Sequence, residues 1–356
     1  MAKYDLSLPV LVLLLLGAGL ITISSVAISP DLASQNIFQK QLLGVGLALV
    51  PIALLWWLGR DRIYLLAPVV YGVALLLQAS TFVIGKDVNG QQNWIVLGPV
   101  QFQPLELLKL SLILFLPVVM RGGYKGLRSY LLPLAVFLPA LALVVKEDFG
   151  GALVLLVMFA AILLAWKVPW WHLVLALVLV GAAFPTVIYP RLKPYQQARL
   201  TIFVNPQRDP RGQGYQIIQS TIAIGSGGMQ GKGYGKGTQS HNGFVPEAHN
   251  DFVLAPWAEE QGFVGCVALL TVFGALFWRL ANMGSECTRL QDQLLFAGVL
   301  GQIGFQAIEN MGAALSMLPL TGITLPLVSY GLSSLVMVLT TLGAAYVVYR
   351  DRFSGM

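Results

Sequence analysis

Long apolar runs separated by short polar connections make up most of this chain. Each run has about 17 to 25 mainly apolar residues, the length that a helix needs to cross the hydrocarbon core of a bilayer. The pattern predicts about ten spanning helices, at approximately 8–28, 40–58, 63–84, 105–120, 131–146, 150–166, 171–189, 252–278, 293–317 and 327–349. Prolines such as Pro117 and Pro139 interrupt the short fourth to sixth spans, so we expect tilt or partial unwinding there.

The predicted fold class is therefore an all-α integral membrane protein with a single polytopic membrane domain over residues 1–356. Spans 1–7 occupy 1–189, one long loop occupies 190–251, and spans 8–10 occupy 252–349. The first apolar run follows Lys3 and resembles a signal peptide. It is too long for the apolar region of such a peptide, so we expect it to be retained as a span.

Composition excludes a water-soluble protein. Of the 356 residues, 56% are hydrophobic and 11% are charged, whereas soluble domains carry about 25% charged residues. The net charge of +6 is scattered over short loops and not gathered on one face, which argues against a nucleic-acid partner. The two cysteines, Cys266 and Cys287, form no CxxC or Cys/His cluster, so no zinc site is indicated.

The distribution of Lys and Arg predicts the orientation. With the N-terminus in the cytoplasm, the cytoplasmic segments hold eleven of these residues and the opposite short segments hold three. Cytoplasmic loops carry such an excess, so both termini are predicted to be cytoplasmic and the loop 190–251 to be extracytoplasmic. The eleven are Lys3, Arg60, Arg62, Arg121, Lys125, Arg128, Lys167, Arg279, Arg289, Arg350 and Arg352, and the three are Lys40, Lys86 and Lys146.

The long loop is basic and rich in glycine. Between Gly212 and Gly243 it contains ten glycines interleaved with polar residues. Such a segment can bend closely around a polar ligand. The alternative, which composition alone favours, is a flexible surface loop.

Ionisable residues near the outer ends of spans are candidates for a site, because charges at membrane depth usually face a cavity or a partner. Glu106 and Lys109 lie three residues apart on one helical face, where they either form a structural ion pair or bind substrate. Asp148 precedes the sixth span, a position where an aspartate commonly caps backbone amides.

A second acidic cluster, Glu247, His249 and Asp251, precedes the eighth span. Asp251 is either an N-cap or a desolvated carboxylate that serves as a general base. Glu309, in the ninth span, is assigned to interhelical hydrogen bonding without a catalytic role. We expect Glu309 and the pair Glu259-Glu260 in the inner half of the bundle, whereas Glu106, Lys109, Asp148 and Asp251 share the outer side, which favours a single site.

Several of these stretches together resemble the SEDS family (shape, elongation, division and sporulation), in its RodA-like elongation branch. The resemblance covers nearly the whole chain, and the Gly-Thr-Gln-Ser stretch at 237–240 favours the elongation branch over the division branch. The matching stretches are 93–98, 103–109, 148–150, 214–228, 231–233, 237–240, 246–252, 318–322 and 325–331.

The resemblance implies a peptidoglycan glycosyltransferase that polymerises lipid II at the outer face of the bacterial cytoplasmic membrane, for cell elongation and shape. It implies that Asp251 is the catalytic carboxylate, that Glu106 and Lys109 are a functional pair, and that Asp148 is an acidic residue near the central cavity. It also implies a partner, a class B penicillin-binding protein that supplies the transpeptidase.

For the mechanism we expect Asp251 to accept the proton of an acceptor hydroxyl in an inverting displacement of polyprenyl diphosphate. Cations stabilise the leaving group, and the candidates for this role are Lys109, Arg208, Arg211, Lys232 and Lys236. A divalent cation is compatible with this chemistry, but no motif indicates a metal or another cofactor. The full set of substrate-binding candidates is Glu106, Lys109, Asp148, Arg208, Arg211, Lys232, Lys236, Glu247 and His249.

Two alternatives remain at this point. A flippase or transporter for lipid-linked precursors would also use a cavity lined by scattered charges, but polar groups confined to one side argue against a route through both leaflets. A non-catalytic scaffold of a cell-wall complex would tolerate Asp251→Asn.

Overall fold

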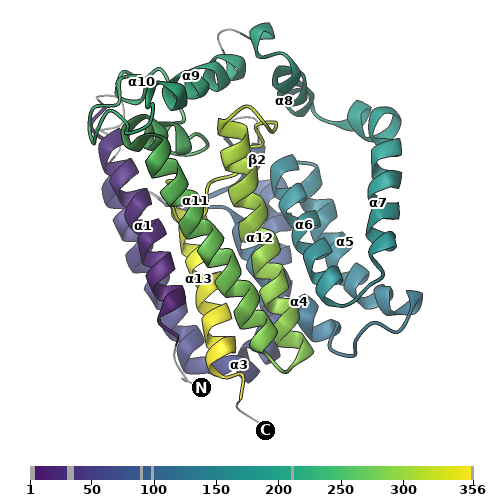
Figure 1. The fold of residues 1–356 in the computed structure, drawn as a ribbon. Helices are drawn as coiled ribbons and strands as arrows, with labels where there is room; N and C mark the ends of the chain where they lie inside the picture. The colour runs from purple at the N-terminus through teal and green to yellow at the C-terminus, as the bar shows by residue number, and fades with distance from the viewer. Residues whose placement is uncertain (1–4, 30–35, 89–90, 98–99, 210–211, 354–356) are drawn as a thin grey trace. The chain divides into compact units, whose positions relative to one another are not determined.

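A computed structural model describes residues 5–29, 36–88, 91–97, 100–209 and 212–353 as a nearly all-helical chain (Figure 1). Six helices are long and apolar enough to cross a membrane, and α6 is a shorter apolar helix. Each predicted span coincides with a helix in the described residues, which confirms the fold class of a multi-pass membrane protein. The helices are α1 (Ser7–Val26), α3 (Ile37–Ile84), α4 (Pro104–Val119), η1 (Leu127–Tyr130), α5 (Leu131–Val145), α6 (Phe149–Ala165), α7 (Trp170–Ala183), η2 (Phe184–Ile188), η3 (Tyr189–Arg191), α8 (Pro194–Val204), η4 (Pro206–Arg208), α9 (Gln213–Ser226), α10 (Thr238–His241), α11 (Leu254–Glu286), α12 (Leu290–Ala314) and α13 (Leu332–Arg350).

The second and third predicted spans are the two halves of α3. They are separated at Gly59, which has φ 72° and ψ 168°, a conformation outside the helical region. Glycine adopts a positive φ without the steric cost that a side chain adds. The backbone N–H of Arg60, which begins the second half, donates to Asp351 Oδ2 at 3.1 Å.

A small antiparallel sheet follows α3 and was not predicted. It consists of β1 (Lys86–Val88), β2 (Gln91–Leu97) and β3 (Val100–Phe102), in the order β1-β2-β3. Lys86 pairs with Trp94, and Ile95 pairs with Phe102. Its strands are too short to be detected in a hydropathy pattern built on spans of about 20 residues, yet β2 carries Asn93, which donates a hydrogen bond to Asp148.

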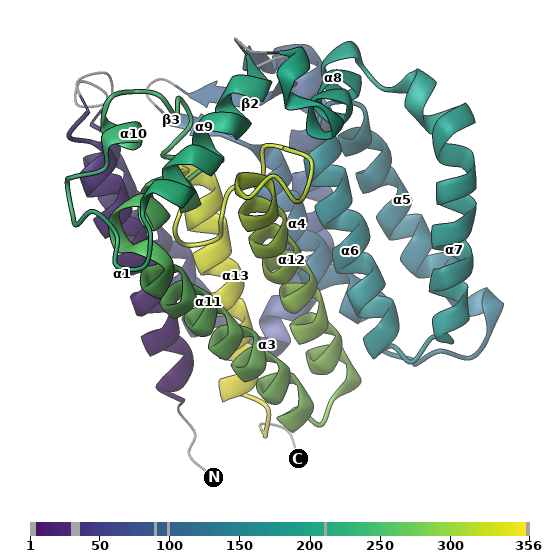
Figure 2. The ribbon, with the colours of Figure 1, turned by 45° about the horizontal axis from the view of Figure 1, so that its top comes forward.

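The chain divides into two compact units. Unit 1 comprises Met1–Leu49, Ala198–Arg279 and Gln306–Leu339. Within it, α1 runs antiparallel beside α11 (Figure 2): Ser25 Oγ donates to Glu260 near one end, and Arg279 Nη2 lies 2.6 Å from Asp5 Oδ2 near the other.

Unit 2 comprises Val50–Gln197, Leu280–Phe305 and Thr340–Met356. In it, α4, α5 and α6 follow one another in the chain and lie side by side (Figure 1). The rings of Phe137 in α5 and Phe159 in α6 stack with their centroids 4.1 Å apart. Gly301 of α12 packs directly on α6, because a Cβ there would lie 2.7 Å from Ala161 Cβ.

The glycine-rich part of the long loop forms backbone hydrogen bonds with α11 at a break in that helix. That helix is interrupted at Gly262, with φ 67° and ψ −166°, so backbone groups around it lose their helical partners. Lys232 N–H and Gly233 N–H donate to the carbonyls of Glu259 and Glu260, both at 3.0 Å, while Phe263 N–H donates to Gly228 O at 2.9 Å. We call residues 228–233 the splint of α11, because these hydrogen bonds hold them on that helix. They do not form the flexible surface loop that composition favours, while ligand binding by the loop stays a prediction.

Candidate active site

Asp251 lies in a turn that leads into α11, and it is partly exposed. Because α11 begins at Leu254, Asp251 precedes the N-cap position by two residues. The turn is closed by the N–H of Phe252, which donates to Glu247 O at 3.1 Å. Asn310 of α12 fixes its position from the side: Nδ2 donates to Asp251 O at 2.9 Å and to Ile323 O at 2.8 Å.

The segment between α12 and α13 packs on this turn through hydrogen bonds to its backbone. Ser329 Oγ donates to Asn250 O at 2.7 Å, and Tyr330 N–H donates to His249 O at 2.8 Å. Gln41 of α3 in turn donates to Ser329 O at 3.1 Å. Two chain segments about 80 residues apart in sequence thus hold each other rigid next to the Asp251 carboxylate.

Gly322 lies beside both the Arg199 guanidinium and the Asp251 carboxylate. It has φ 81°, and a Cβ there would lie 3.4 Å from Arg199 Nη1, 3.5 Å from Arg199 Nη2 and 3.7 Å from Asp251 Oδ2. The guanidinium comes from α8 and is fixed by Thr321 O, which accepts a hydrogen bond from Nη1 at 2.5 Å. Because residue 322 is a glycine, no Cβ occupies this position beside the two charged groups.

Glu309 completes this group. It is only 3% exposed, accepts a hydrogen bond from Thr321 N–H at 3.2 Å and another from the Thr321 hydroxyl, and is near enough to Asp251 and Arg199 to interact with their charges. We call Asp251, Arg199, Glu309, Thr321 and Gly322 the Asp251 cluster. The expectation that Glu309 lies in the inner half of the bundle is wrong, because α12 carries it to the turn that holds Asp251. Its assignment to hydrogen bonding without a catalytic role stays a prediction.

His249 and Glu247 flank the Asp251 turn. His249 is 9% exposed, its ring centroid lies 5.6 Å from that of Tyr330, and its Nδ1 has no hydrogen-bond partner among the described residues. Burial lowers the pKa of His249 below its usual 6.5, although the charge of Glu247 opposes this shift. Glu247 Oε2 accepts a hydrogen bond from Asn250 Nδ2 at 2.9 Å, so it also stabilises the turn.

In unit 2, Glu106 and Lys109 form the expected ion pair. Lys109 Nζ lies 2.7 Å from Glu106 Oε1, and the two residues are 2% and 5% exposed in that order. Glu106 Oε2 is buried and has no hydrogen-bond partner among the described residues. The structure therefore shows the ion pair, and the substrate-binding role of Glu106 and Lys109 stays a prediction.

Asp148 caps α6, as its position before the helix predicts. Its Oδ1 accepts a hydrogen bond from Gly151 N–H at 2.7 Å. Its Oδ2 accepts from Asn93 Nδ2 at 3.2 Å and from Gln103 Nε2 at 3.3 Å. The carboxylate therefore ties the start of α6 to β2 and to the start of α4, which explains why it is buried.

The loop cations proposed for the diphosphate lie in different environments. Lys232 Nζ is 2.6 Å from the buried Glu259 carboxylate, which also accepts from Ser240 N–H and Oγ. Its charge is therefore already balanced by Glu259 in the α10–α11 region. Arg208 and Lys236 are exposed, and Arg211 lies outside the described residues.

No group of three or more His, Cys, Asp or Glu in the part of the chain described here is arranged to hold a metal ion. The acidic groups of the Asp251 cluster instead face the Arg199 guanidinium around Gly322. A partly exposed carboxylate, fixed by the backbone on two sides and facing a cation, is suited to accepting a proton next to an anionic substrate.

The profile of the FtsW/RodA/SpoVE cell cycle protein family matches residues 6–352. The chain belongs to the FtsW/RodA/SpoVE family. It is 34% identical to a protein of Thioalkalivibrio sp. (strain K90mix), over 98% of this chain and 90% of the relative, and 36% identical to one of Aliivibrio salmonicida (strain LFI1238), over 91% and 83%. Both relatives are named "Probable peptidoglycan glycosyltransferase FtsW".

Solved structures of the FtsW/RodA/SpoVE family match over nearly the whole chain. A structure described as "Structural coordination of polymerization and crosslinking by a peptidoglycan synthase complex" has a TM-score of 0.85 and 41% identity, with 99% of both chains covered. Thermus thermophilus RodA has a TM-score of 0.75 and 36% identity, with 99% of this chain and 98% of that chain covered. The family resemblance seen in the sequence is confirmed, whereas relatives from both the FtsW and RodA branches match, so the RodA-like assignment stays a prediction.

The sequence prediction missed both ionisable members of the Asp251 cluster other than Asp251 itself. Arg199 is absent from the predicted site, because nothing in the sequence shows that α8 meets the segment before α13. Glu309 did carry a signal, since an ionisable residue inside an apolar span is a candidate for function by default.

Proposed function

We propose that this chain is a peptidoglycan glycosyltransferase that polymerises lipid II. The observation that carries the proposal is the Asp251 cluster: a partly exposed carboxylate in a rigid turn, with a guanidinium facing the same point beside Gly322. The names of its relatives and the similarity to a peptidoglycan synthase complex support the same activity.

In the proposed reaction, the oxygen of an acceptor sugar hydroxyl attacks the anomeric carbon of the lipid-linked donor. The new glycosidic C–O bond forms as the C–O bond to the diphosphate breaks, and the bonding electron pair leaves with the polyprenyl diphosphate. Asp251 takes the hydroxyl proton. Because attack and departure are on opposite faces, the displacement inverts the anomeric configuration.

The second group, Glu106 and Lys109, is proposed to contact substrate through the free oxygen of Glu106. Lys109 orients the glutamate through their 2.7 Å contact. Asp148 is proposed to act by positioning, since its carboxylate is occupied by the cap of α6 and by Asn93 and Gln103. His249 and Glu247 are proposed to shape the turn beside the acceptor sugar.

For location, we infer that both termini are cytoplasmic and that Asp251 faces the outer surface of the bacterial cytoplasmic membrane, as the distribution of Lys and Arg predicts. The proposed partner is a class B penicillin-binding protein, since a polymerase requires a transpeptidase to crosslink its product. A role in elongation is proposed on the Gly-Thr-Gln-Ser stretch, whose Ser240 and Gln239 backbone amides bind Glu259.

The test uses the purified chain in detergent, with and without the transpeptidase, and labelled lipid II whose products are sized on gels. Wild type is expected to form glycan polymer, and Asp251→Asn to lower the rate by about 100-fold or more. Asp61→Asn, at a 71% exposed side chain, is the matched control. Polymer formed undiminished by Asp251→Asn overturns the base, and lipid II translocation in vesicles without polymer supports a transporter.

A further inference from the structure

Four exposed cations lie in the connections at one end of α4 to α7. They are Arg121, Lys125 and Arg128, between α4 and α5, and Lys167, between α6 and α7. None of the four forms an ion pair within the described part of the chain. In other connections predicted to be cytoplasmic, by contrast, Arg60, Arg289 and Arg350 each lie within 3.3 Å of an aspartate oxygen.

The sequence around the four cations lacks acidic residues. No Asp or Glu occurs at 107–146 or at 149–208, so the charges of these two stretches are positive only. The orientation of the spans does not require this imbalance, because it depends on the presence of Lys and Arg and little on Asp and Glu. The cations of these connections therefore take their counter-charge from outside the two stretches.

Aromatic side chains hold the two connections together. Trp166 Nε1 donates to Met120 O at 2.9 Å, and the ring centroid of Tyr124 lies 5.6 Å from those of Tyr130 and Trp166. Tyr130 Oη lies 2.7 Å from His172 Nδ1. We call Tyr124, Tyr130, Trp166 and His172 the aromatic cluster. The cations within two residues of its members are Lys125, Arg128 and Lys167.

The surface beside these cations is apolar. Leu127, Leu131, Leu164 and Trp170 are each more than half exposed, and no side chain in the most apolar part of Trp170–Arg191 is buried. Tyrosine and tryptophan are enriched where a membrane meets water. A soluble anion would contact only the cations, whereas a phospholipid places its phosphate beside the cations and its acyl chains along the apolar side chains.

Lys167 carries its charge at a backbone position that favours glycine. Its φ is 62°, and the end of α6 is closed there by Lys167 N–H, which donates to Leu164 O at 3.0 Å, and by Val168 N–H, which donates to Leu163 O at 3.2 Å. Glycine adopts this conformation without the steric cost of a side chain. Lys167→Gly therefore removes a cation without adding backbone strain.

We propose that the four cations, with the aromatic cluster that holds their backbone, form a binding site for the headgroup of an anionic phospholipid. By the predicted orientation the lipid belongs to the cytoplasmic leaflet. The site lies at the opposite ends of α4 and α6 from Glu106 and Asp148, and it does not depend on the proposed glycosyltransferase function.

The test measures lipid binding by native mass spectrometry, on the purified full chain in detergent from which bound lipid has been removed. Phosphatidylglycerol supplies a negatively charged headgroup, and phosphatidylcholine with the same acyl chains supplies a headgroup without net charge. One variant is Lys167→Gly, and the other combines Arg121→Gln, Lys125→Gln, Arg128→Gln and Lys167→Gln. The matched control is Arg289→Gln, at a 38% exposed side chain that lies 2.8 Å from Asp61.

Wild type is expected to bind phosphatidylglycerol at least about 10-fold more tightly than phosphatidylcholine. The fourfold variant is expected to bind the two lipids with equal affinity to within about 2-fold. Lys167→Gly is expected to weaken phosphatidylglycerol binding by about 5-fold without lowering the thermal unfolding midpoint. Arg289→Gln is expected to keep the wild-type affinity to within about 2-fold, because its charge is already paired.

Equal affinity of wild type for the two lipids overturns the inference, and so does a preference for phosphatidylglycerol that persists in the fourfold variant. An equal loss in Arg289→Gln also overturns it, because the lipid would then respond only to the net charge of the chain. If the fourfold variant does not fold, Lys167→Gly decides: weaker phosphatidylglycerol binding supports the site, and unchanged binding overturns it.

Discussion

At the scale of single residues, the Asp251 cluster contains a group that acts through others. Glu309 accepts hydrogen bonds from the backbone and hydroxyl of Thr321, whose carbonyl holds Arg199. Removing the acceptor in Glu309→Ala is expected to lower kcat by at least about 10-fold, because the Thr321 segment and the guanidinium lose their orientation. Glu309→Gln keeps an acceptor oxygen and is expected to restore activity to within about 3-fold of wild type.

Lipid II polymerisation rates at saturating substrate check this prediction. Ile308→Ala, at a neighbouring side chain of α12 that is 60% exposed, is the control and is expected to leave kcat unchanged. Equal losses in the alanine and glutamine variants would contradict a positioning role, because they would mean that the carboxylate itself is required.

The sequence identifies Asp251 as a candidate site residue, but it does not show which residues surround it. An aspartate that precedes a span at the outer side is visible as a candidate from its position alone. Arg199 and Thr321 are more than 100 residues apart in the chain, and their contact depends on how α8 and the segment before α13 fold. Asp148 shows the opposite case, since its cap on Gly151 follows from local sequence.

At the scale of elements, the glycine-rich splint explains why α11 tolerates a break at Gly262. Gly231 has φ 76°, and a Cβ there would lie 2.1 Å from Glu260 O. Gly231→Ala is therefore expected to reduce the free energy of unfolding by about 2 kcal/mol or more, by strain and by loss of the bonds that replace helical ones. Thermal unfolding in detergent measures this change.

The control for the splint is Gly225→Ala in α9, where a Cβ would meet nothing within 4 Å. That variant is expected to be neutral or more stable by up to about 1 kcal/mol, because alanine favours helix. Equal stability of the two alanine variants would show that the splint does not hold α11. Neither composition nor hydropathy reveals such pairing, because both treat a glycine-rich loop only as flexible.

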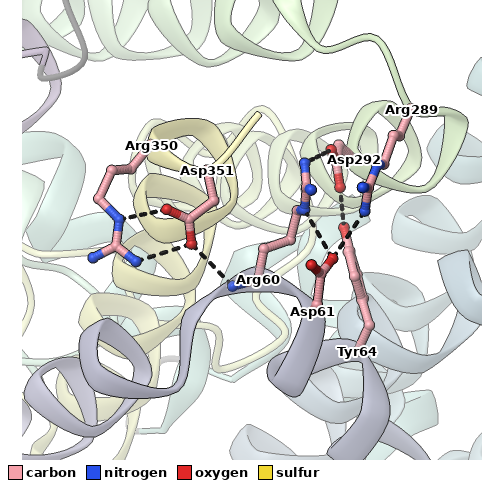
Figure 3. A network of polar contacts seen from close by, with 7 residues as sticks. All are labelled: Arg60, Asp61, Tyr64, Arg289, Asp292, Arg350 and Asp351. Carbon is pink, nitrogen blue, oxygen red and sulfur yellow. Dashed lines mark hydrogen bonds and ion pairs between the residues drawn. The ribbon is translucent and has the colours of Figure 1, made fainter. Parts of the chain in front are cut away.

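The break in the middle of α3 is stabilised by a polar network with the start of α12 and the end of α13 (Figure 3). Asp351 accepts from the Arg60 N–H at 3.1 Å and from the Arg350 Nε at 2.7 Å. Beside it, the Asp292 carboxylate accepts hydrogen bonds from Arg60 Nη1 and Tyr64 Oη, and both Arg60 and Asp292 are buried. These charge-assisted hydrogen bonds thus stabilise the chain where α3 is interrupted at Gly59.

This network predicts a pH dependence. Burial alone would raise the pKa of Asp351, but hydrogen bonds from Arg350 and the Arg60 N–H lower it below its usual 3.8. The unfolded chain therefore binds this proton more readily, so the stabilisation is complete above the unfolded pKa and is lost as the pH falls through the folded value. The difference in unfolding midpoint between wild type and Asp351→Asn is expected to be largest near pH 7 and to shrink below about pH 4. A difference that does not vary with pH would contradict this role.

At the scale of the whole molecule, the positions of the helices follow from the sequence because each span must bury its backbone groups within itself. Every predicted span overlaps an observed helix, and even the division of α3 at Gly59 agrees with two spans at 40–58 and 63–84. The sequence did not predict the sheet of β1 to β3 or the course of α8 to α10. Outside the membrane-spanning segments, backbone groups have many possible hydrogen-bond partners, so the pattern of apolar residues does not determine one arrangement. The sequence therefore predicts the membrane-spanning helices more accurately than the segments outside the membrane.

The orientation of the whole chain is the last property that the proposed chemistry requires, since the proposed polymerisation of lipid II takes place at the outer surface of the membrane. Single cysteines test it: Asn242→Cys in the long loop and Arg121→Cys after α4, both at exposed positions. Cys266 is replaced by alanine, whereas Cys287 is expected to react slowly, because burial and the neighbouring Asp292 raise the pKa of its thiol to about 12. A membrane-impermeant maleimide is expected to label Asn242→Cys in cells whose cytoplasmic membrane is intact, and Arg121→Cys only after that membrane is permeabilised. The reverse pattern would place Asp251 in the cytoplasm, where a base for outer-surface polymerisation has no substrate.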